Sequence, residues 1–468
     1  MKLRDLSVPV EISSVLSDLG GVSTGKAKVA YPNEFSDGLN GASESMRKEL
    51  HRCLATVTDE LISLSRELHD RPELGFDEYF AADRVAALLR KYDISCEEGV
   101  FSFDTALRAN VGQGTEFGKL TPTQAFVGDD VPTFCLTCEF DALPKLGHGC
   151  GHNVMCAQSV GAFLSLALLE RRAQGSLKGR ILFQTTPAEE NSTCKELLFQ
   201  RGAFENVDAV AMAHSYGVDV GQHVWLAQKR LTVEFVGISA HASSAPFMGR
   251  NALDAACLTL NGLSMLRQQT TSDVRLHAII SEGGNVPNVI PERAKLDVCV
   301  RAEDAKILLY YLKQICDIFH GAALMTGTGV RISGLEEPNE MPVRYNKILL
   351  QSWIRAERNC GREPVPLGAI PEGTAASTDF GNLSVRIPAI HPLVGLGDTT
   401  LKLHTKEMAA AARSVRANAA VVDGAYGLAC VALDFISDEL MRERVMSEFE
   451  LQGGLVNVPA LFREIGKM

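Results

Sequence analysis

The chain has 468 residues and a formal net charge of −11, with 46% hydrophobic and 22% charged residues. An acidic chain lacks the basic surface that nucleic acids and anionic membranes require, so we expect neither class of partner. The length exceeds what one hydrophobic core usually supports, which predicts two domains.

The beginning of the chain shows little periodicity. Residues 1–44 are rich in Ser, Gly and Asp, and we expect a leader that lies on the surface or is partly disordered. We find neither the apolar core of a signal peptide nor a run of about 18 apolar residues. Most of the twelve cysteines, among them Cys135, Cys257 and Cys430, lie in apolar runs, as reduced core cysteines do. A cytoplasmic protein without a transmembrane helix is therefore expected.

Predicted helices and strands alternate from Ser45 onward. Apolar residues recur at three- and four-residue spacing from Leu50 to Leu68, which predicts a helix that ends at Pro72 and Gly75. Further helices are predicted at 77–92, 153–172 and from about 192, and buried strands at 133–137, 179–185 and 207–213. This alternation predicts an α/β domain with a mostly parallel sheet and helices on both faces.

The pattern changes between residues 221 and 337. The predicted elements there are strand 227–237, helix 251–268, strands 273–282 and 294–301, helix 305–323 and strand 329–335. This β-α-β-β-α-β order is that of a split, ferredoxin-like α+β unit. Because helix–strand alternation resumes after Pro338, the second domain is predicted to be inserted in the first, which comprises residues 45–220 and 338–468.

Four polar features follow predicted strands. They are His148-Gly-Cys150-Gly-His152, Glu189-Glu190, His214 and His404. In open α/β sheets ligands bind outside the carboxyl ends of the strands, so we expect these features to meet at one site.

The residue types in this set suit a metal. Thiolate, imidazole and carboxylate are the usual ligands of zinc and related cations, and a bound metal lowers the pKa of water towards about 7. One carboxylate of the Glu pair could bind metal while the other acts as base. Taken singly, Cys150 or His214 could be a core residue and the Glu pair a solvated face. Their joint placement at strand ends favours a metal site.

Several ordered motifs resemble metallopeptidase family 20, in its amidohydrolase branch. They are Glu139-Phe-Asp-Ala-Leu-Pro144, His148 to Asn153, Thr186-Pro-Ala-Glu-Glu190, Ala213-His214, His69 to Gly75, Gly237 to Ser243, Asn285 to Pro291 and Ala376 to Asp379. The resemblance covers about residues 45–440. It implies that the inserted domain is a lid and dimerisation domain, and that the protein is a homodimer with two divalent metal ions per chain. Zinc or manganese is expected, and cobalt is a further option.

The resemblance also implies roles for individual residues. The expected metal ligands are Cys150, His152, Glu190, His214 and His404. Glu189 is the expected general base, and Glu139 or Asp141 is expected to orient a ligand histidine.

Residues of the lid are implied in substrate binding and catalysis. His241 is expected to reach the partner subunit's site and stabilise the oxyanion, although it could instead cap the next helix. Asn288 and Arg301 are expected to hold the substrate carboxylate, although Arg301 could form a structural ion pair. His391 is expected to line the pocket.

These features predict a metal-dependent hydrolase that cleaves an amide bond in a small, carboxylate-bearing substrate, either a dipeptide or an N-acyl or N-aroyl amino acid. The alternatives are an N-acyl amino acid aminoacylase and a non-catalytic, metal-binding dimeric scaffold. Glu189 and His241 argue against a scaffold, which needs neither. Many amidohydrolases carry Asp at the position of Asn153. The p-aminobenzoyl-glutamate hydrolases and the animal dipeptidases that act on β-alanyl-lysine type substrates tend to carry Asn there, as this chain does.

Overall fold

The structure, a computed structural model, describes residues 38–466 apart from 116–129, 174, 368–375 and 399. Most of the leader predicted over residues 1–44 therefore lies outside the described residues. The last part of that segment packs into the first domain, where Leu39 and Ala42 are buried and the Ala42 N–H donates to Asp434 Oδ1 at 2.8 Å. For these residues the prediction of a surface leader is wrong.

The first domain is built on a six-stranded sheet with strand order β1-β2-β4-β3-β5-β11. The strands are β1 (Glu97–Glu98), β2 (Leu107–Gly112), β3 (Thr133–Cys138), β4 (Arg180–Thr185), β5 (Ala209–Ala211) and β11 (Ala389–Ile390). Strands β4, β3, β5 and β11 run parallel, whereas β2 pairs antiparallel with β1 and β4. Beyond β5 and β11, β6 (His214–Tyr216) and β12 (Leu393–Gly395) form a second parallel pair.

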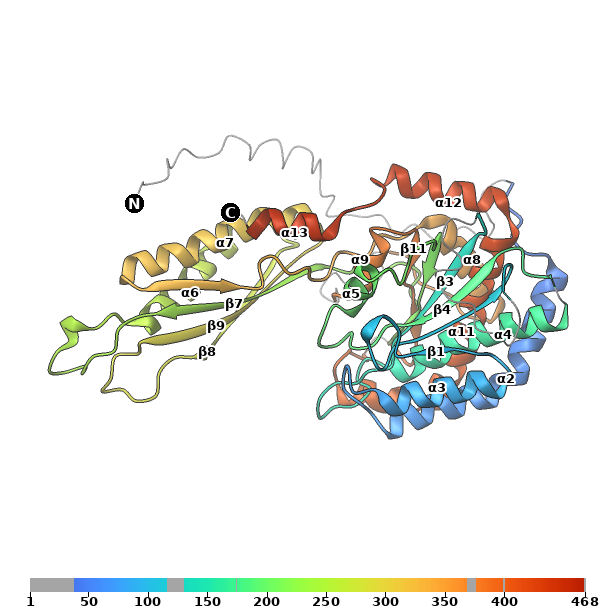
Figure 1. Ribbon diagram of the computed structural model, residues 1–468, viewed down its shortest axis with the longest axis horizontal. Helices are drawn as coiled ribbons and strands as arrows, with labels where there is room; N and C mark the ends of the chain where they lie inside the picture. Colours follow the sequence, from blue (N-terminus) through green and yellow to red (C-terminus); the bar gives the residue numbers. More distant parts are fainter. Residues whose placement is uncertain (1–37, 116–129, 174, 368–375, 399, 467–468) are drawn as a thin grey trace.

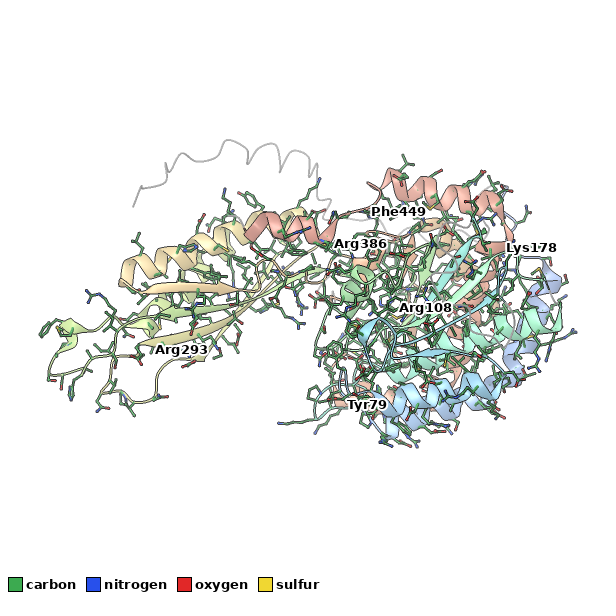
Figure 2. The ribbon with its side chains drawn as sticks, in the orientation of Figure 1. Tyr79, Arg108, Lys178, Arg293, Arg386 and Phe449 are labelled. Atoms are coloured by element: carbon green, nitrogen blue, oxygen red, sulfur yellow. The ribbon has the colours of Figure 1, made fainter. Side chains whose placement is uncertain are left out.

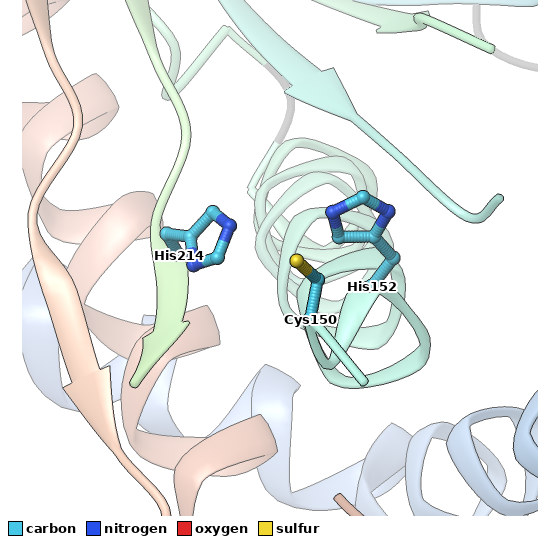
Figure 3. Close-up of side chains that lie close together, drawn as sticks. All are labelled: Cys150, His152 and His214. Atoms are coloured by element: carbon cyan, nitrogen blue, oxygen red, sulfur yellow. The ribbon is translucent and has the colours of Figure 1, made fainter. Parts of the chain in front are cut away.

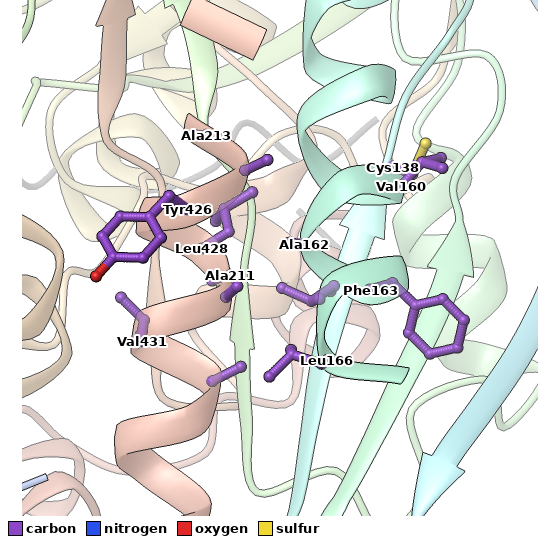
Figure 4. Close-up of a cluster of buried hydrophobic side chains, with 14 of the residues drawn as sticks. Cys138, Val160, Ala162, Phe163, Leu166, Ala211, Ala213, Tyr426, Leu428 and Val431 are labelled. Carbon is purple, nitrogen blue, oxygen red and sulfur yellow. The ribbon is translucent and has the colours of Figure 1, made fainter. Parts of the chain in front are cut away.

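Helices cover both faces of this sheet, which confirms the predicted α/β architecture (Figure 1). One face is covered by α2 (Glu44–Asp70), α4 (His152–Arg172), α8 (Lys347–Asn359) and α11 (Val415–Ser437), and the other by α5 (Cys194–Gln200) and α9 (Phe380–Ser384). The remaining helices of the domain are α3 (Tyr79–Lys91), α10 (Lys406–Ala411) and α12 (Glu439–Leu451). Figure 4 shows the larger core, where α4 and α11 pack beside each other against the strands.

Close packing at this core depends on a glycine. A Cβ on Gly161 of α4 would lie 2.5 Å from Leu61 Cδ1 of α2 and 2.9 Å from Ala425 Cβ of α11. Such distances are too short for carbon atoms, so Gly161 lets the three helices approach one another. Among the described helices, α4 and α11 are long and apolar enough to span a membrane by length and composition alone. Their apolar windows are 100% and 83% buried within the protein, so they are core helices, and the expectation that no such run occurs is corrected.

The second domain has the predicted β-α-β-β-α-β order. Its four strands pair antiparallel in the order β10-β7-β9-β8, and two helices cover one face. The elements are β7 (Ala227–Val236), α6 (Ala252–Leu266), β8 (Arg275–Glu282), β9 (Arg293–Ala302), α7 (Ala305–Thr326) and β10 (Gly329–Ser333). Figure 1 shows that this domain, called the lid below, projects away from the first, called the catalytic domain.

The last helix, α13 (Val458–Gly466), lies on the lid. The sequence assigned residues 338–468 to the catalytic domain, but α13 packs against α7, and Val458 and Phe462 are fully buried in the lid core. The segment that leads to α13 is tied to the catalytic domain, since the Val456 N–H donates to the Val385 carbonyl at 3.0 Å. A third chain segment therefore connects the two domains, in addition to the two crossings at the ends of the lid.

A buried ion pair between Arg386 and Glu196 lies in the catalytic domain near this third connection. Figure 2 shows Arg386 on the side of the catalytic domain that faces the lid. Its guanidinium donates to Glu196 Oε2 at 2.7 Å and to Glu196 Oε1 at 2.9 Å, and both side chains are buried. Because a two-point pair of this kind has a fixed geometry, it holds α5 against the chain that follows α9.

All twelve cysteines are unpaired. Cys135 and Cys430 are buried, as the sequence predicts, whereas Cys257 is exposed. Cys257 lies on α6, which buries only one side against the sheet. Apolar neighbours in the sequence do not show whether a residue lies on the buried or the exposed side of a helix.

Candidate metal centre

The polar residues predicted to meet do so at one edge of the catalytic sheet. The loop between β3 and α4 carries Cys150, Glu189 and Glu190 follow β4, His214 begins β6 after β5, and His404 follows β12. These positions lie at or beyond the carboxyl ends of parallel strands, where side chains from different strands converge.

A glycine turn aims Cys150 and His152 at the same point. Gly151 between them has a φ of 77°, and a Cβ there would lie 2.7 Å from Ser215 Cβ, so glycine is required for both reasons. Figure 3 shows the Cys150 thiol between the imidazoles of His152 and His214. One donor atom from each of these three residues lies within 4.8 Å of the other two.

A second group of donors shares Cys150. It consists of Cys150, Glu190 and His404, again with donor atoms within 4.8 Å of one another. His404 Nε2 lies 3.0 Å from Cys150 Sγ and 3.6 Å from Glu190 Oε2. His152, Glu189 and Glu190 form a further group of this kind. The five predicted ligands thus form two adjacent groups that have the thiol in common.

Hydrogen bonds fix the tautomers of His152 and His214, two of the predicted ligands. His214 Nδ1 lies 2.7 Å from the Ser215 carbonyl, and His152 Nδ1 lies 3.0 Å from Asp141 Oδ1. Both partners are acceptors, so each Nδ1 carries the proton and each Nε2 keeps a lone pair for a metal. His152 Nε2 is buried without a hydrogen-bond partner among the described residues.

Asp141 also contacts the loop that carries Glu189 and Glu190. Its Oδ2 accepts the Glu190 N–H at 2.9 Å, while its Oδ1 accepts from His152. Glu139, the other residue expected to orient a histidine, has Oε2 3.5 Å from His152 Nε2, on the side where a metal would bind. The orienting contact to His152 is therefore made by Asp141.

The site concentrates negative charge in a poorly hydrated place. Burial, followed by the charges of Glu139 and Glu190, raises the pKa of Glu189 well above its usual range. Burial and then Glu190 likewise raise the pKa of the Cys150 thiol. A cation among these groups would offset both effects, so the donor set and its electrostatics fit divalent metal ions.

Two residues of the site were not predicted. Lys195 of α5 is fully buried and forms ion pairs with Glu139 and Asp379. The Lys195 N–H also donates to Asp379 Oδ2 at 3.0 Å. Carboxylate oxygens of Glu139, Glu189 and Asp379 lie within 4.8 Å of one another. Asp379 ended a motif in the sequence without an assigned role, and Lys195 looks like any helical lysine.

The remaining residues of the motifs have structural partners. His148 Nε2 contacts the Leu68 carbonyl at 3.2 Å and its ring stacks on His69, and His148 belongs to none of the donor groups found among the described residues. His391 is fully buried, with Nδ1 3.1 Å from the Met212 carbonyl and its ring against His214. Asn153 Nδ2 donates to the Ser65 and Ala412 carbonyls, a pair that the carboxylate of an Asp could not satisfy.

The three lid residues with predicted roles, His241, Asn288 and Arg301, are divided between the two ends of the lid sheet. His241 and Asn288 belong to the loops at the tip, where the Ala242 N–H donates to the Asn288 carbonyl at 3.0 Å. Arg301 lies near the other end of β9, beside the catalytic domain and on the face without helices. Within one chain, therefore, Asn288 and Arg301 do not come together on one carboxylate.

The protonation of His241 suits a hydrogen-bond donor. Its Nδ1 accepts the backbone N–H groups of Ser243 and Ser244, both at 3.3 Å, which places the ring proton on Nε2. The imidazole thus caps the following turn and still exposes an N–H. Arg301 makes no ion pair or side-chain hydrogen bond within the part of the chain that the structure describes.

Comparisons with known proteins agree with this geometry. Residues 228–322 match the peptidase dimerisation domain of the M20 family. The chain is 34% identical to the Xaa-Arg dipeptidase of Mus musculus, over 90% of this chain and 96% of that protein. It is 30% identical to one of the subunits of the Escherichia coli p-aminobenzoyl-glutamate hydrolase, over 57% and 56% of the two chains. Its fold resembles a dinuclear metal-binding M20 peptidase of Bacillus subtilis, with a TM-score of 0.60, 19% identity and coverage of 82% and 99%.

Proposed function

Because this chain belongs to the M20 family of metallopeptidases, we propose that it hydrolyses dipeptides and prefers those with a basic C-terminal residue. It is a metal-dependent hydrolase that acts on an amide bond in a small, carboxylate-bearing substrate. The observation that carries the dipeptide proposal is the similarity to Xaa-Arg dipeptidase along nearly the whole chain. The similarity to the aminobenzoyl-glutamate hydrolase covers little more than half of it.

We further propose that two divalent cations bind at the two donor groups that share Cys150. The first would be held by Cys150, His152 and His214 and the second by Cys150, Glu190 and His404. A mixed thiolate, imidazole and carboxylate set suits zinc, and manganese and cobalt are the alternatives. Bound there, the cations would supply a nucleophilic water at neutral pH and polarise the amide carbonyl.

Proton transfer in this proposal is the task of Glu189. The carboxylate accepts the proton of the attacking water and then delivers it to the leaving amine. Glu189 is adjacent to Glu190 and near His152, so a base and two ligands surround the same point.

A homodimer is proposed because the lid tip cannot serve its own active site. The ten residues of β7 run from the catalytic domain towards the tip and, at about 3.3 Å per residue, span about 33 Å. His241 would therefore reach the site of a second copy, where its Nε2–H stabilises the oxyanion. The tip exposes apolar side chains that a partner would cover: Val236, Ile238, Phe247, Met248, Val286 and Val289.

The same arrangement supplies two groups for the substrate carboxylate. Arg301 of one copy and Asn288 from the lid of the other would approach the site from opposite sides. Arg301 has no ion pair among the described residues that would compete for its guanidinium. We also propose a cytoplasmic location, which the unpaired cysteines support.

The test combines elemental analysis with assays of amide hydrolysis. The panel contains β-alanyl-lysine, β-alanyl-arginine, β-alanyl-alanine, p-aminobenzoyl-glutamate, hippurate and an acetyl amino acid, each with zinc, manganese and cobalt. We expect about two metals per chain and chelator-sensitive cleavage, fastest for the basic dipeptides. Faster cleavage of the aroyl or acetyl substrates would overturn the dipeptide assignment. Full metal content without cleavage of any substrate would favour the scaffold.

A further inference from the structure

Glu78 contacts the active-site loop from outside the metal centre. It precedes α3, yet its side chain does not cap that helix. The carboxylate is completely buried, with Oε1 accepting the Ala188 N–H at 2.7 Å and Oε2 accepting the Thr105 hydroxyl at 2.9 Å. A buried carboxylate with both oxygens directed to fixed donors is a strong local constraint.

Ala188 needs such a constraint. It immediately precedes Glu189 and has a φ of 60°, a left-handed conformation that is unfavourable for a residue with a Cβ. Residues of this kind persist where surrounding contacts over-determine the backbone, and they cluster at functional sites. The hydrogen bond that the Ala188 N–H donates to Glu78 Oε1 is the contact that acts directly on this amide.

The backbone is held on both sides of Glu189. The N–H that precedes it, at Ala188, donates to Glu78, and the N–H that follows it, at Glu190, donates to Asp141 at 2.9 Å. The loop before Glu78 packs closely against the turn at Ala188, since a Cβ on Gly75 would lie only 2.7 Å from Ala188 Cα. This close approach explains why the motif that runs from His69 to Gly75 ends in glycine.

We propose that Glu78 is a positioning residue that aims the Glu189 carboxylate by holding the Ala188 N–H. The proposal rests on the role of Glu189 as base, given above. Glu78 touches neither metal ligand nor substrate in this scheme and acts only through the backbone. A displacement of about 1 Å in a catalytic group can lower turnover about 100-fold, so the loss of this hydrogen bond should be visible in kcat.

The kinetic test compares three variants of the full-length, metal-loaded protein. Glu78→Ala should lower kcat by about 10- to 100-fold with KM and metal content unchanged. Glu78→Gln keeps an acceptor for the Ala188 N–H and should restore kcat to within about threefold of wild type. Thr105→Val is the matched control, because it removes the other hydrogen bond of the carboxylate and leaves the bond to Ala188. Wild-type kcat in Glu78→Ala, or an equal loss in Thr105→Val, would overturn the proposal.

Hydrogen exchange separates this proposal from the proposed function. The amide of Ala188 should exchange faster in Glu78→Ala than in wild type or Thr105→Val, as measured on a peptide that covers residues 186–193. This result is expected even if no tested amide is cleaved, which would refute only the proposed function. Equal exchange in all of the proteins would overturn the role of Glu78 whatever the activity.

Discussion

At the residue scale, the contrast between Glu189 and Glu190 shows how two neighbouring carboxylates take different roles. Glu190 is anchored through its N–H to Asp141 and shares a donor group with Cys150 and His404. Glu189 belongs to groups that reach His152 on one side and the buried Glu139 and Asp379 on the other. Glu189 is absent from both donor groups that share Cys150, so it is the carboxylate that cations at those two groups would leave free.

Replacement of Glu189 by Gln tests this division. We expect kcat to fall by about 10²- to 10⁴-fold, because the amide cannot accept a proton while the shape of the site is kept. Elemental analysis should still find the wild-type metal content. Turnover near that of wild type would contradict the assignment of the base, and loss of metal would make Glu189 a ligand instead.

Glu357 predicts a pH dependence of stability that is separate from catalysis. Burial raises the pKa of Glu357 from 4.5 to about 8, and Arg362 opposes this only in part. Between these values the folded protein retains a proton that the unfolded chain releases, so stability falls as pH rises through this range. Glu357→Gln has no such proton, and its free energy of unfolding relative to wild type should increase from about pH 5 to about pH 8. Urea denaturation at several pH values measures this difference, and parallel curves would contradict it.

The meeting of the five candidate metal ligands could be predicted from the sequence because their chemistry is distinctive and all follow strands. Their binding of metal stays a prediction. The place of Lys195 could not be predicted, because burial between two carboxylates depends on tertiary contacts that leave no pattern in its neighbours. The sequence likewise did not predict that Asn288 and Arg301 lie at opposite ends of the lid. Asn288 belongs to the motif Asn285 to Pro291, whereas Arg301 lies outside the quoted motifs, and only the strand geometry places the two residues at different ends of the lid sheet.

At the scale of elements, α13 shows where apolar periodicity in the sequence no longer predicts how a helix packs. The lid strands and helices were predicted because their apolar residues repeat over several turns or alternations. α13 follows Gly453 and Gly454. It buries Val458 and Phe462 in the lid core, with Leu461 partly buried against it, and this pattern is too short to indicate where the helix docks.

Phe462→Ala tests the docking of α13. Phe462 is fully buried and lies beneath Lys229 Nζ, which is 4.6 Å from the ring centre. Truncation of a buried Phe costs about 3–5 kcal/mol, so the lid should unfold at a lower denaturant concentration. The exposed Arg463→Ala is the control on the same helix. Equal unfolding midpoints for the two variants would show that α13 does not contribute to the lid core.

At the scale of the whole molecule, the reach of the lid predicts complementation between subunits. Glu189→Gln and His241→Ala should each be nearly inactive. A mixed dimer, however, contains one site in which the intact Glu189 meets the intact His241 of the other copy. A random mixture should recover about a quarter of the wild-type rate, since half of the dimers are mixed and each has one complete site.

The control for this experiment is a mixture of the same two variants whose dimers cannot exchange subunits, for example after chemical cross-linking of each. Subunit exchange in the test mixture is verified by native mass spectrometry. Complete exchange without recovery of activity would mean that His241 does not act across the dimer.

The insertion of the lid in the catalytic domain also sets the order in which the two domains can fold during synthesis on the ribosome. Strands β7 to β10 emerge as one continuous segment, so every pairing partner within the lid sheet is present before the second half of the catalytic domain is synthesised. Helix α4 must wait for α11, which lies beyond the lid in the chain and packs along it. The nascent lid would fold first, with the apolar surface on α7 uncovered until α13 leaves the exit tunnel. Completion of the last helix would then bury the apolar surface that a chaperone could recognise on the unfinished chain.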